Sequence, residues 1–382
     1  MKPSSWHYWI GLLLSLALIP CLRSLHLPIR FDWKTLGIAY WLVLAAQSIF
    51  VAALLSVIGR PMSAVLRPLA QRYRQAPLRI VLVVLYLGFL SWAFTVVKAL
   101  VLTVDTIAIL EFRESRSAAE LRKTAAAVGL AALYLFAGFL LVFAYNDIIV
   151  SARFNFAYDP AFYAMDRWLL HGASVSGLSH WAVRKLPLFW FYFLEFIYFG
   201  MFAQIGAGLI LVTVCEERRR GLQFVGTILT AYYLALGLFY LWPSHGPYFL
   251  CPAHFSRFPR TLQAYTIQQT LIRNALARWN HVPLHWISTD YFIAFPCMHI
   301  AQPLIVIWFL ARWRRMVMAL CAYDTLLILS IVLLEWHYLV DILGGVLVAG
   351  AAIAINEGIG LRDRRKHAGE MPPERQGTRF VS

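Results

Sequence analysis

The chain has 382 residues, of which 60% are hydrophobic, 15% aromatic and 14% charged, and its mean hydropathy is +0.65. Soluble domains carry about 25% charged residues, so this composition excludes a soluble globular protein and predicts an all-α, polytopic membrane protein. The net charge of +15 is divided among short clusters between apolar stretches. This pattern excludes nucleic acid as the expected partner and favours the anionic headgroups of a lipid bilayer.

Eight stretches are apolar and long enough, at about 20 residues each, to cross a bilayer. They cover residues 36–58, 78–104, 124–150, 187–214, 222–242, 291–310, 316–335 and 337–358. A ninth stretch at 7–25 is shorter, with one basic residue before it and no small-residue cleavage site. We interpret it as a retained helix rather than a signal peptide, which gives eight to nine expected transmembrane helices.

The distribution of Lys and Arg predicts the topology. They are more numerous on the side that carries Arg218-Arg219-Arg220, the 311–315 turn and the tail, which the positive-inside rule assigns to the cytoplasm. The 243–290 loop and the 335–337 connection then lie outside. When 7–25 is counted as the first span, several arginines fall between the second span (36–58) and the third (78–104), on the supposed outer face. They contradict this alternation, so we expect either an interfacial helix there or a different span count. These arginines are Arg60, Arg67, Arg72, Arg74 and Arg79.

The chain divides into three expected regions. Residues 1–150 form an N-terminal transmembrane region of unknown role, and residues 151–360 carry the chemistry that can be interpreted and form the expected catalytic domain. Residues 361–382, with Pro372-Pro373 and mixed charge, are expected to be a disordered cytoplasmic tail. Glu195, inside an apolar stretch, is either a functional residue or a neutral acid bonded to a neighbouring helix.

The loop after the 222–242 stretch carries candidate substrate-binding residues. It reads Trp242-Pro243-Ser244-His245-Gly246-Pro247-Tyr248-Phe249, and its Pro and Gly residues break the helix. We expect His245 and Tyr248 to fold over a headgroup. Residues 261–279 predict an amphipathic helix whose lipid-facing residues are Leu262, Leu271, Leu276 and Trp279. Three arginines in this loop are candidates for binding phosphate, namely Arg257, Arg260 and Arg273.

Two histidines and one aspartate lie at the edges of the last apolar helices, within Phe295-Pro296-Cys297-Met298-His299 and His337-Tyr338-Leu339-Val340-Asp341. His337 and Asp341 are four residues apart, so on a helix they share one face and the carboxylate can orient the imidazole. Folding must bring His299 to them. A neutral His337 could attack phosphorus while His299 supplies a proton. These residues predict phosphoryl transfer through a histidine nucleophile.

The sequence FPCMH followed by HYLVD resembles the two catalytic motifs of the type 2 phosphatidic acid phosphatase superfamily, and it is most similar to the inositol phosphorylceramide synthase-like (inositolphosphotransferase) branch. The resemblance covers approximately residues 155–358 and extends to the 242–249 segment. It implies a C-terminal six-helix core, a site at one membrane face and no metal requirement. It also implies that His337 is the nucleophile, Asp341 its orienting acid and His299 the general acid.

The chain also departs from the pattern of that superfamily. Cys297 stands where many relatives carry a serine that touches phosphate, which makes Cys297 a candidate substrate-binding residue by resemblance. The second motif lacks its usual Ser-Arg start and has Ser330-Ile331 instead. Phosphate binding is then expected to fall to other groups, such as the loop arginines.

We therefore expect an integral membrane lipid phosphatase or phosphotransferase that acts without a cofactor, through a phosphohistidine, on a phospholipid, sphingolipid or polyprenyl phosphate. We expect it in a bacterial inner membrane with the active site on the extracytoplasmic face. The residues do not separate hydrolase from transferase. Two alternatives stay open: a metal site of two histidines and one carboxylate, and an inactive transporter or scaffold that retains the fold and binds lipid.

Overall fold

The computed structural model describes residues 158–215, 218–250, 262–279 and 294–369, together with short pieces of 10–17 and 130–150. Helices are the only regular elements in these ranges, which confirms the predicted all-α class. The predicted spans at 36–58 and 78–104 lie outside the described residues, as does most of 7–25.

Four helices in this part of the chain are long and apolar enough to cross a membrane. They are α9 (Leu188–Cys215), α10 (Arg218–Leu241), α14 (Arg314–Leu333) and α15 (Leu339–Gly369). They coincide with four of the predicted stretches, so the long apolar helices expected there are confirmed. Shorter apolar helices run over Ala137–Val150 and over α13 (Met298–Phe309).

The expected span at 291–310 begins too early. Residues Ala294 to Cys297 are not helical, and α13 starts only at Met298. Pro296 accounts for the difference, because proline has no N–H to donate and disfavours helical backbone in the residue before it. The non-helical segment is the one that carries the first candidate motif.

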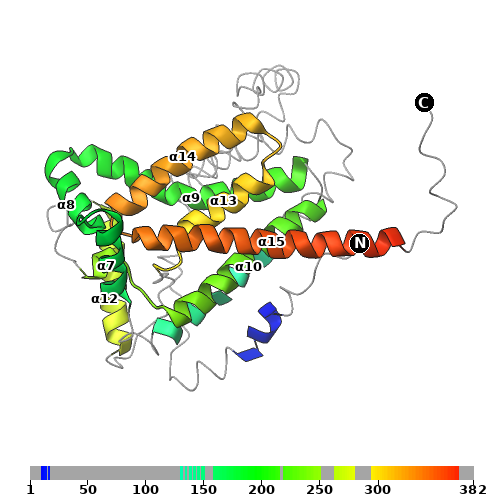
Figure 1. Cartoon of the computed structure of the whole chain (residues 1–382), viewed down its shortest axis with the longest axis horizontal. Helices are drawn as coiled ribbons and strands as arrows, with labels where there is room; N and C mark the ends of the chain where they lie inside the picture. The colour runs from blue at the N-terminus through cyan, green and yellow to red at the C-terminus, as the bar shows by residue number, and fades with distance from the viewer. Residues whose placement is uncertain are drawn as a thin grey trace, which may run out of the picture.

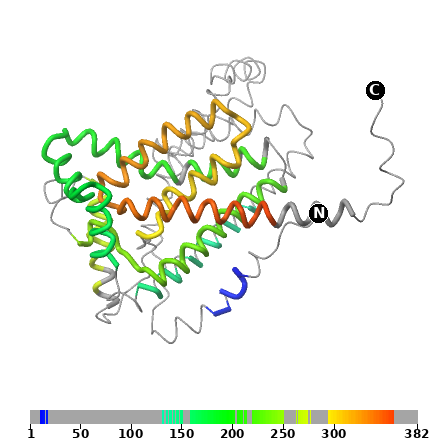
Figure 2. Tube along the Cα trace, viewed as in Figure 1, coloured from blue at the N-terminus to red at the C-terminus, as the bar shows by residue number. Residues whose placement is uncertain are grey.

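α13 lies at the centre of the bundle, in contact with α9, α10, α14 and α15. Its residues Ile305 and Val306 are fully buried. Gly208 of α9 allows close approach, since a Cβ atom there would lie 3.2 Å from Val306 Cγ1. The long helices run beside one another (Figure 1), and the Cα trace shows α13 between α14 and α15 (Figure 2).

Four shorter helices gather at one end of the bundle (Figure 1). They are α7 (Asp159–Leu169), α8 (Val175–Lys185), α11 (Pro247–Leu250) and α12 (Gln263–Trp279). Ser174 caps α8 by accepting a bond from the Gly177 N–H at 3.0 Å. Glu195 of α9 likewise accepts from the Ala264 N–H in the first turn of α12. Glu195 is thus a helix-capping acid.

The predicted helix at 261–279 is confirmed by α12. Leu276 is exposed as expected, but the lipid-facing positions predicted for two other leucines are wrong. Leu262 and Leu271 are only 1% and 3% exposed and pack against the protein core rather than lipid. The reason is tertiary: Gln268 donates to the Leu334 carbonyl at 2.8 Å, which holds this face of α12 against the end of α14.

Large aromatic side chains are exposed around this same end of the bundle. They come from α7, α8, the start of α9 and the residue after α10, namely Trp168, Trp181, Phe189, Trp190 and Trp242. Exposed Trp residues at the ends of apolar helices are typical of a membrane–water interface. We refer to this end, with α7, α8, α11 and α12, as the aromatic end.

Candidate active site

Three loops meet at the aromatic end, and backbone hydrogen bonds fix them to one another. Ser244 accepts from the Ala294 N–H through its carbonyl at 3.0 Å and from the Phe295 N–H through its hydroxyl at 3.1 Å. The Cys297 N–H donates to the Asp341 carbonyl at 2.9 Å. The sequence segments that carry the motifs are therefore joined through main-chain groups.

Two glycines permit these loops to approach so closely. Gly246 has φ of +101°, and a Cβ atom there would lie 2.7 Å from the Trp336 carbonyl oxygen. At Gly345 in α15, a Cβ would lie 2.3 Å from the Cys297 carbonyl oxygen. Any side chain at Gly345 would force the start of α13 away from α15. Gly344 and Gly345 thus permit α15 to pack closely against the segment before α13.

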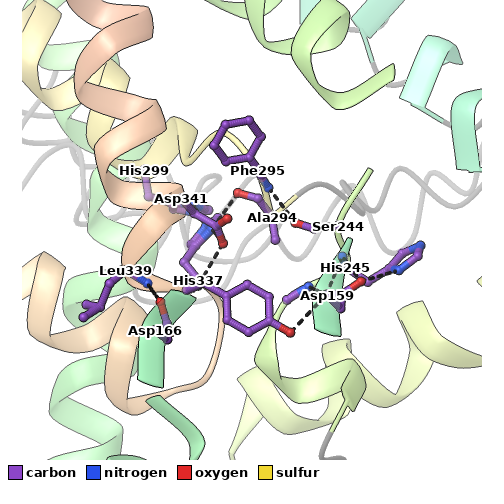
Figure 3. Close-up of polar contacts among 12 residues, drawn as sticks. Asp159, Asp166, Ser244, His245, Ala294, Phe295, His299, His337, Leu339 and Asp341 are labelled. Carbon is purple, nitrogen blue, oxygen red and sulfur yellow. Dashed lines mark hydrogen bonds and ion pairs between the residues drawn. The ribbon is translucent and has the colours of Figure 1, made fainter. Parts of the chain in front are cut away.

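The structure brings His299 and His337 together, with His299 Nδ1 lying 3.0 Å from His337 Nε2 (Figure 3). His337 Nδ1 lies 2.9 Å from the Ala294 carbonyl oxygen and 3.5 Å from Asp341 Oδ2. A carbonyl oxygen only accepts hydrogen bonds, so Nδ1 carries a proton. Nε2, the nitrogen that faces His299, is then the reactive one.

Asp341 has a second role beyond the one expected. Its Oδ2 atom accepts from the Tyr338 N–H at 2.8 Å and so caps the first turn of α15. The Ala294 carbonyl, rather than Asp341 alone, makes the shorter contact with His337 Nδ1. The carboxylate thus contributes mainly negative charge beside the ring, and the carbonyl fixes the tautomer.

Charge at the pair favours a bound proton. Burial opposes the imidazolium, but the Cys297 sulfur and the Asp341 carboxylate outweigh burial and raise the pKa of His337 to about 10. Because the two facing nitrogens lie at hydrogen-bond distance, they share one proton in the resting state. Attack by His337 requires that this proton resides on His299.

An aromatic stack fixes His299 from the side. The Tyr198 ring lies between His299, at 4.6 Å between centroids, and Trp336, at 4.9 Å and almost parallel. Tyr198 belongs to α9, which has aromatic residues on every side. No spacing in that run distinguishes Tyr198 from its neighbours, so Tyr198 could not be predicted as a residue of the site.

Asp159 is a buried carboxylate that sequence reasoning missed. It accepts from the backbone N–H groups of His245 and Gly246 at 3.0 and 2.9 Å, and from the Tyr338 hydroxyl at 3.1 Å. The His245 ring also bonds to it, with Nδ1 3.1 Å from Oδ2. The structure thus holds His245 against Asp159, whereas the pair of His299 and His337 forms separately (Figure 3).

Two more buried acids support the loop before α15. Asp166 of α7 accepts from the Leu339 N–H at 2.9 Å, and burial raises its pKa to about 7. Glu335 has φ of +58°, a conformation that favours glycine, and lies against Ser176 and Ser179 of α8. Burial raises the pKa of Glu335 to about 8. Asp166 thus holds the backbone just after His337, whereas the Glu335 side chain lies against α8.

Cys297 lies with the histidine pair, as a buried free thiol. Its sulfur and one nitrogen from each of His299 and His337 lie within 4.8 Å of one another. The alternative site of two histidines and a carboxylate does not form in this arrangement, because Asp341 faces Nδ1 of His337 and His299 faces Nε2. The groups that could hold a metal ion here are a thiol and two imidazoles.

The remaining candidates are placed less centrally. Tyr248 is buried, and its ring packs edge-on against Trp336 at 5.6 Å. Arg273 is exposed and bonds to its own helix, at Gln269 O and Thr270 Oγ1. Arg257 and Arg260 lie outside the described residues.

A family model for the PAP2 superfamily matches residues 160–355, just over half of the chain. The match runs from α7 into α15 and includes the histidine pair and Asp341. No curated protein and no solved structure matches the chain.

Proposed function

The chain belongs to the PAP2 superfamily, and from this premise we propose that it is a lipid phosphatase or phosphotransferase that works through a phosphohistidine at His337. One observation carries the proposal: His337 Nε2 faces His299 Nδ1 at 3.0 Å, while its Nδ1–H is held by the Ala294 carbonyl. A nucleophile, a proton donor and a fixed tautomer are the requirements of this chemistry.

The proposed reaction has two steps. His337 Nε2 attacks phosphorus, the bond from phosphorus to the lipid oxygen breaks, and His299 gives its proton to that oxygen. Water or an alcohol then attacks the phosphohistidine, His299 takes the proton of the attacking hydroxyl, and the nitrogen–phosphorus bond breaks. Asp341 stabilises the positive imidazole ring during both steps.

Substrate binding must break the bond between the two histidines, because the phosphoryl group takes its place between their nitrogens. The rings can separate without disturbing His337 Nδ1, which stays bonded to Ala294. The first turn of α13 begins at Met298, so the positive end of the helix dipole lies beside His299 and favours a phosphate there.

The finer features belong to the same proposal. The motifs favour the inositol phosphorylceramide synthase-like branch, a lipid substrate without a cofactor, and a catalytic domain at 151–360. Cys297 would contact the phosphate, with Tyr248 and the loop arginines near the headgroup. The basic clusters favour an extracytoplasmic site in a bacterial inner membrane. An inactive transporter or scaffold is not favoured, because the match to the PAP2 superfamily includes both histidines of the pair and Asp341.

Trapping the intermediate tests the proposal. Purified protein in detergent is mixed with phosphatidic acid, ceramide 1-phosphate or a polyprenyl phosphate, each labelled in its phosphate, and quenched in base, where phosphohistidine is stable. We expect base-stable, acid-labile label on the wild type and none on His337→Asn. Adding an alcohol acceptor separates transfer from hydrolysis. Labelling of His337→Asn, or turnover in that variant, would refute the mechanism.

A further inference from the structure

We propose that Cys297, His299 and His337 form a binding site for a thiophilic divalent metal ion such as Zn²⁺, and that the bound ion inhibits the enzyme. The binding site stands on the geometry alone, whereas the inhibitory effect rests on the proposed function. Neither the family match nor the mechanism requires such a site.

The ligand geometry is close to what zinc needs. Zinc binds sulfur at about 2.3 Å and imidazole nitrogen at about 2.0 Å in a tetrahedral arrangement, so its ligand atoms lie roughly 3.3–3.7 Å apart. The three ligand atoms here lie within 4.8 Å of one another, and the two histidine nitrogens are 3.0 Å apart. The site is complete when the distance between the two histidine nitrogens increases slightly and the Cys297 sulfur moves slightly closer to them.

Hydrogen bonds position two of the three ligand residues before any metal ion binds. Cys297 is fixed through its backbone N–H to Asp341, and His337 through Nδ1 to Ala294. A metal-bound histidine typically donates its other ring N–H to a carbonyl or carboxylate, which is the arrangement of His337. His299 is only partly buried, whereas Cys297 and His337 are buried.

The donor types select the metal. A thiol and two imidazoles favour Zn²⁺ or Cd²⁺ over Mg²⁺ or Ca²⁺, which prefer oxygen. On binding, the Cys297 thiol and the histidine pair each release a proton to water, and one sulfur–metal and two nitrogen–metal bonds form. No electron is transferred. A fourth position stays open for water or a phosphate oxygen.

The bound ion would occupy both reactive nitrogens. His337 could not attack phosphorus and His299 could not supply a proton, so inhibition by Zn²⁺ would be reversible and reduced by excess substrate. A chelator would restore turnover.

Cobalt absorption tests the site without using activity. Full-length protein in detergent, stripped of metal and kept reduced, is titrated with Co²⁺ alone. We expect one equivalent to bind, with a thiolate-to-cobalt charge-transfer band that Zn²⁺ abolishes. Cys297→Ser removes the band and weakens Zn²⁺ binding by more than about tenfold. Cys321→Ser, which alters the exposed cysteine of α14, leaves both unchanged.

A second ligand variant guards against misfolding at Cys297. His337→Asn keeps the thiol but loses an imidazole, and we expect it to weaken Zn²⁺ binding to a similar extent. A Co²⁺ spectrum without the band, or a band that survives Cys297→Ser, overturns the metal site and leaves the proposed function untouched. Full turnover with one equivalent of Zn²⁺ bound overturns the inhibition, and absence of phosphohistidine overturns the proposed function alone.

Discussion

The two ends of the helix bundle carry their charges in different ways. At the aromatic end, Asp159 and Asp341 are buried and each accepts hydrogen bonds from backbone N–H groups. At the opposite end, Arg220 of α10 pairs with Glu357 of α15 at 2.8 Å, with 27% and 33% of their side chains exposed. Buried charges require fixed partners, whereas exposed ones are screened. The buried acids therefore fix the positions of loops at the aromatic end. The exposed charges at the opposite end act mainly on the orientation of the protein in the membrane.

The largest expected difference between the ends is at His337. We expect His337→Asn to reduce phosphate release by at least about 10⁴-fold, because the variant removes the nucleophile. Phosphate release from vesicles containing phosphatidic acid measures it, and thermal unfolding in detergent checks the fold. Retention of more than a few per cent of the activity would place the nucleophile elsewhere.

His299 is expected to have the next largest effect, and one that depends on the leaving group. We expect His299→Gln to slow hydrolysis of an alkyl phosphate by about 10²–10⁴-fold, the usual contribution of a general acid. An aryl phosphate with an acidic phenol needs no protonation, so its loss would be much smaller. The ratio of kcat values for the two substrates is the measurement. An equal loss with both would contradict the assigned role.

Asp159 tests whether the network at the aromatic end stabilises the fold. Asp159→Asn replaces one carboxylate oxygen with a donor that faces the donors of His245, and we expect a loss of about 3 kcal/mol in unfolding free energy. Denaturant titration in detergent measures it. A change below about 0.5 kcal/mol would show that the loops are held by other contacts.

Glu335 makes stability at the aromatic end depend on pH. Its pKa is raised from 4.5 to about 8, so the folded state favours the protonated acid. This contribution is fully present below pH 4.5 and is lost as the pH rises to about 8. We expect the difference in Tm between the wild type and Glu335→Gln to change over that window and to be constant above it. A difference independent of pH would exclude a titrating Glu335.

Arg220 provides the smallest effect and the matched control. We expect Arg220→Gln to cost at most about 1 kcal/mol, the typical value for an exposed ion pair, and to leave turnover unchanged. Unfolding and phosphate release are measured as for Asp159→Asn. Loss of turnover in Arg220→Gln would mean that the two ends are coupled.

The long helices and the motif residues could be predicted from the sequence because both signals are local. An apolar run as long as α14 is visible without a partner. The spacing of His337 and Asp341 correctly predicts that the two side chains meet, although His337 precedes α15 rather than lying on it. The bond between His299 and His337 joins positions 38 residues apart, and only the motif resemblance anticipated their meeting.

The supporting residues could not be predicted, because their partners are distant in sequence and are backbone groups. Asp166 bonds to Leu339 across 173 positions, and Asp159 to His245 across 86. A backbone N–H has no sequence signature, so nothing in the chain identifies these acids as loop anchors. The early start predicted for α13 and the lipid-facing positions predicted for Leu262 and Leu271 were wrong for a related reason, since loop and core contacts override the local pattern.

Because His299 and His337 share a proton, the rest of the bundle does not need a pathway that supplies protons to the site. Each proposed turnover takes one proton from His299 and returns one, so the histidine pair ends in its starting protonation state. The enzyme therefore needs no chain of acidic residues or waters that conducts protons through the membrane to the site. The helix below the pair can accordingly be dry, as the fully buried Ile305 and Val306 of α13 are.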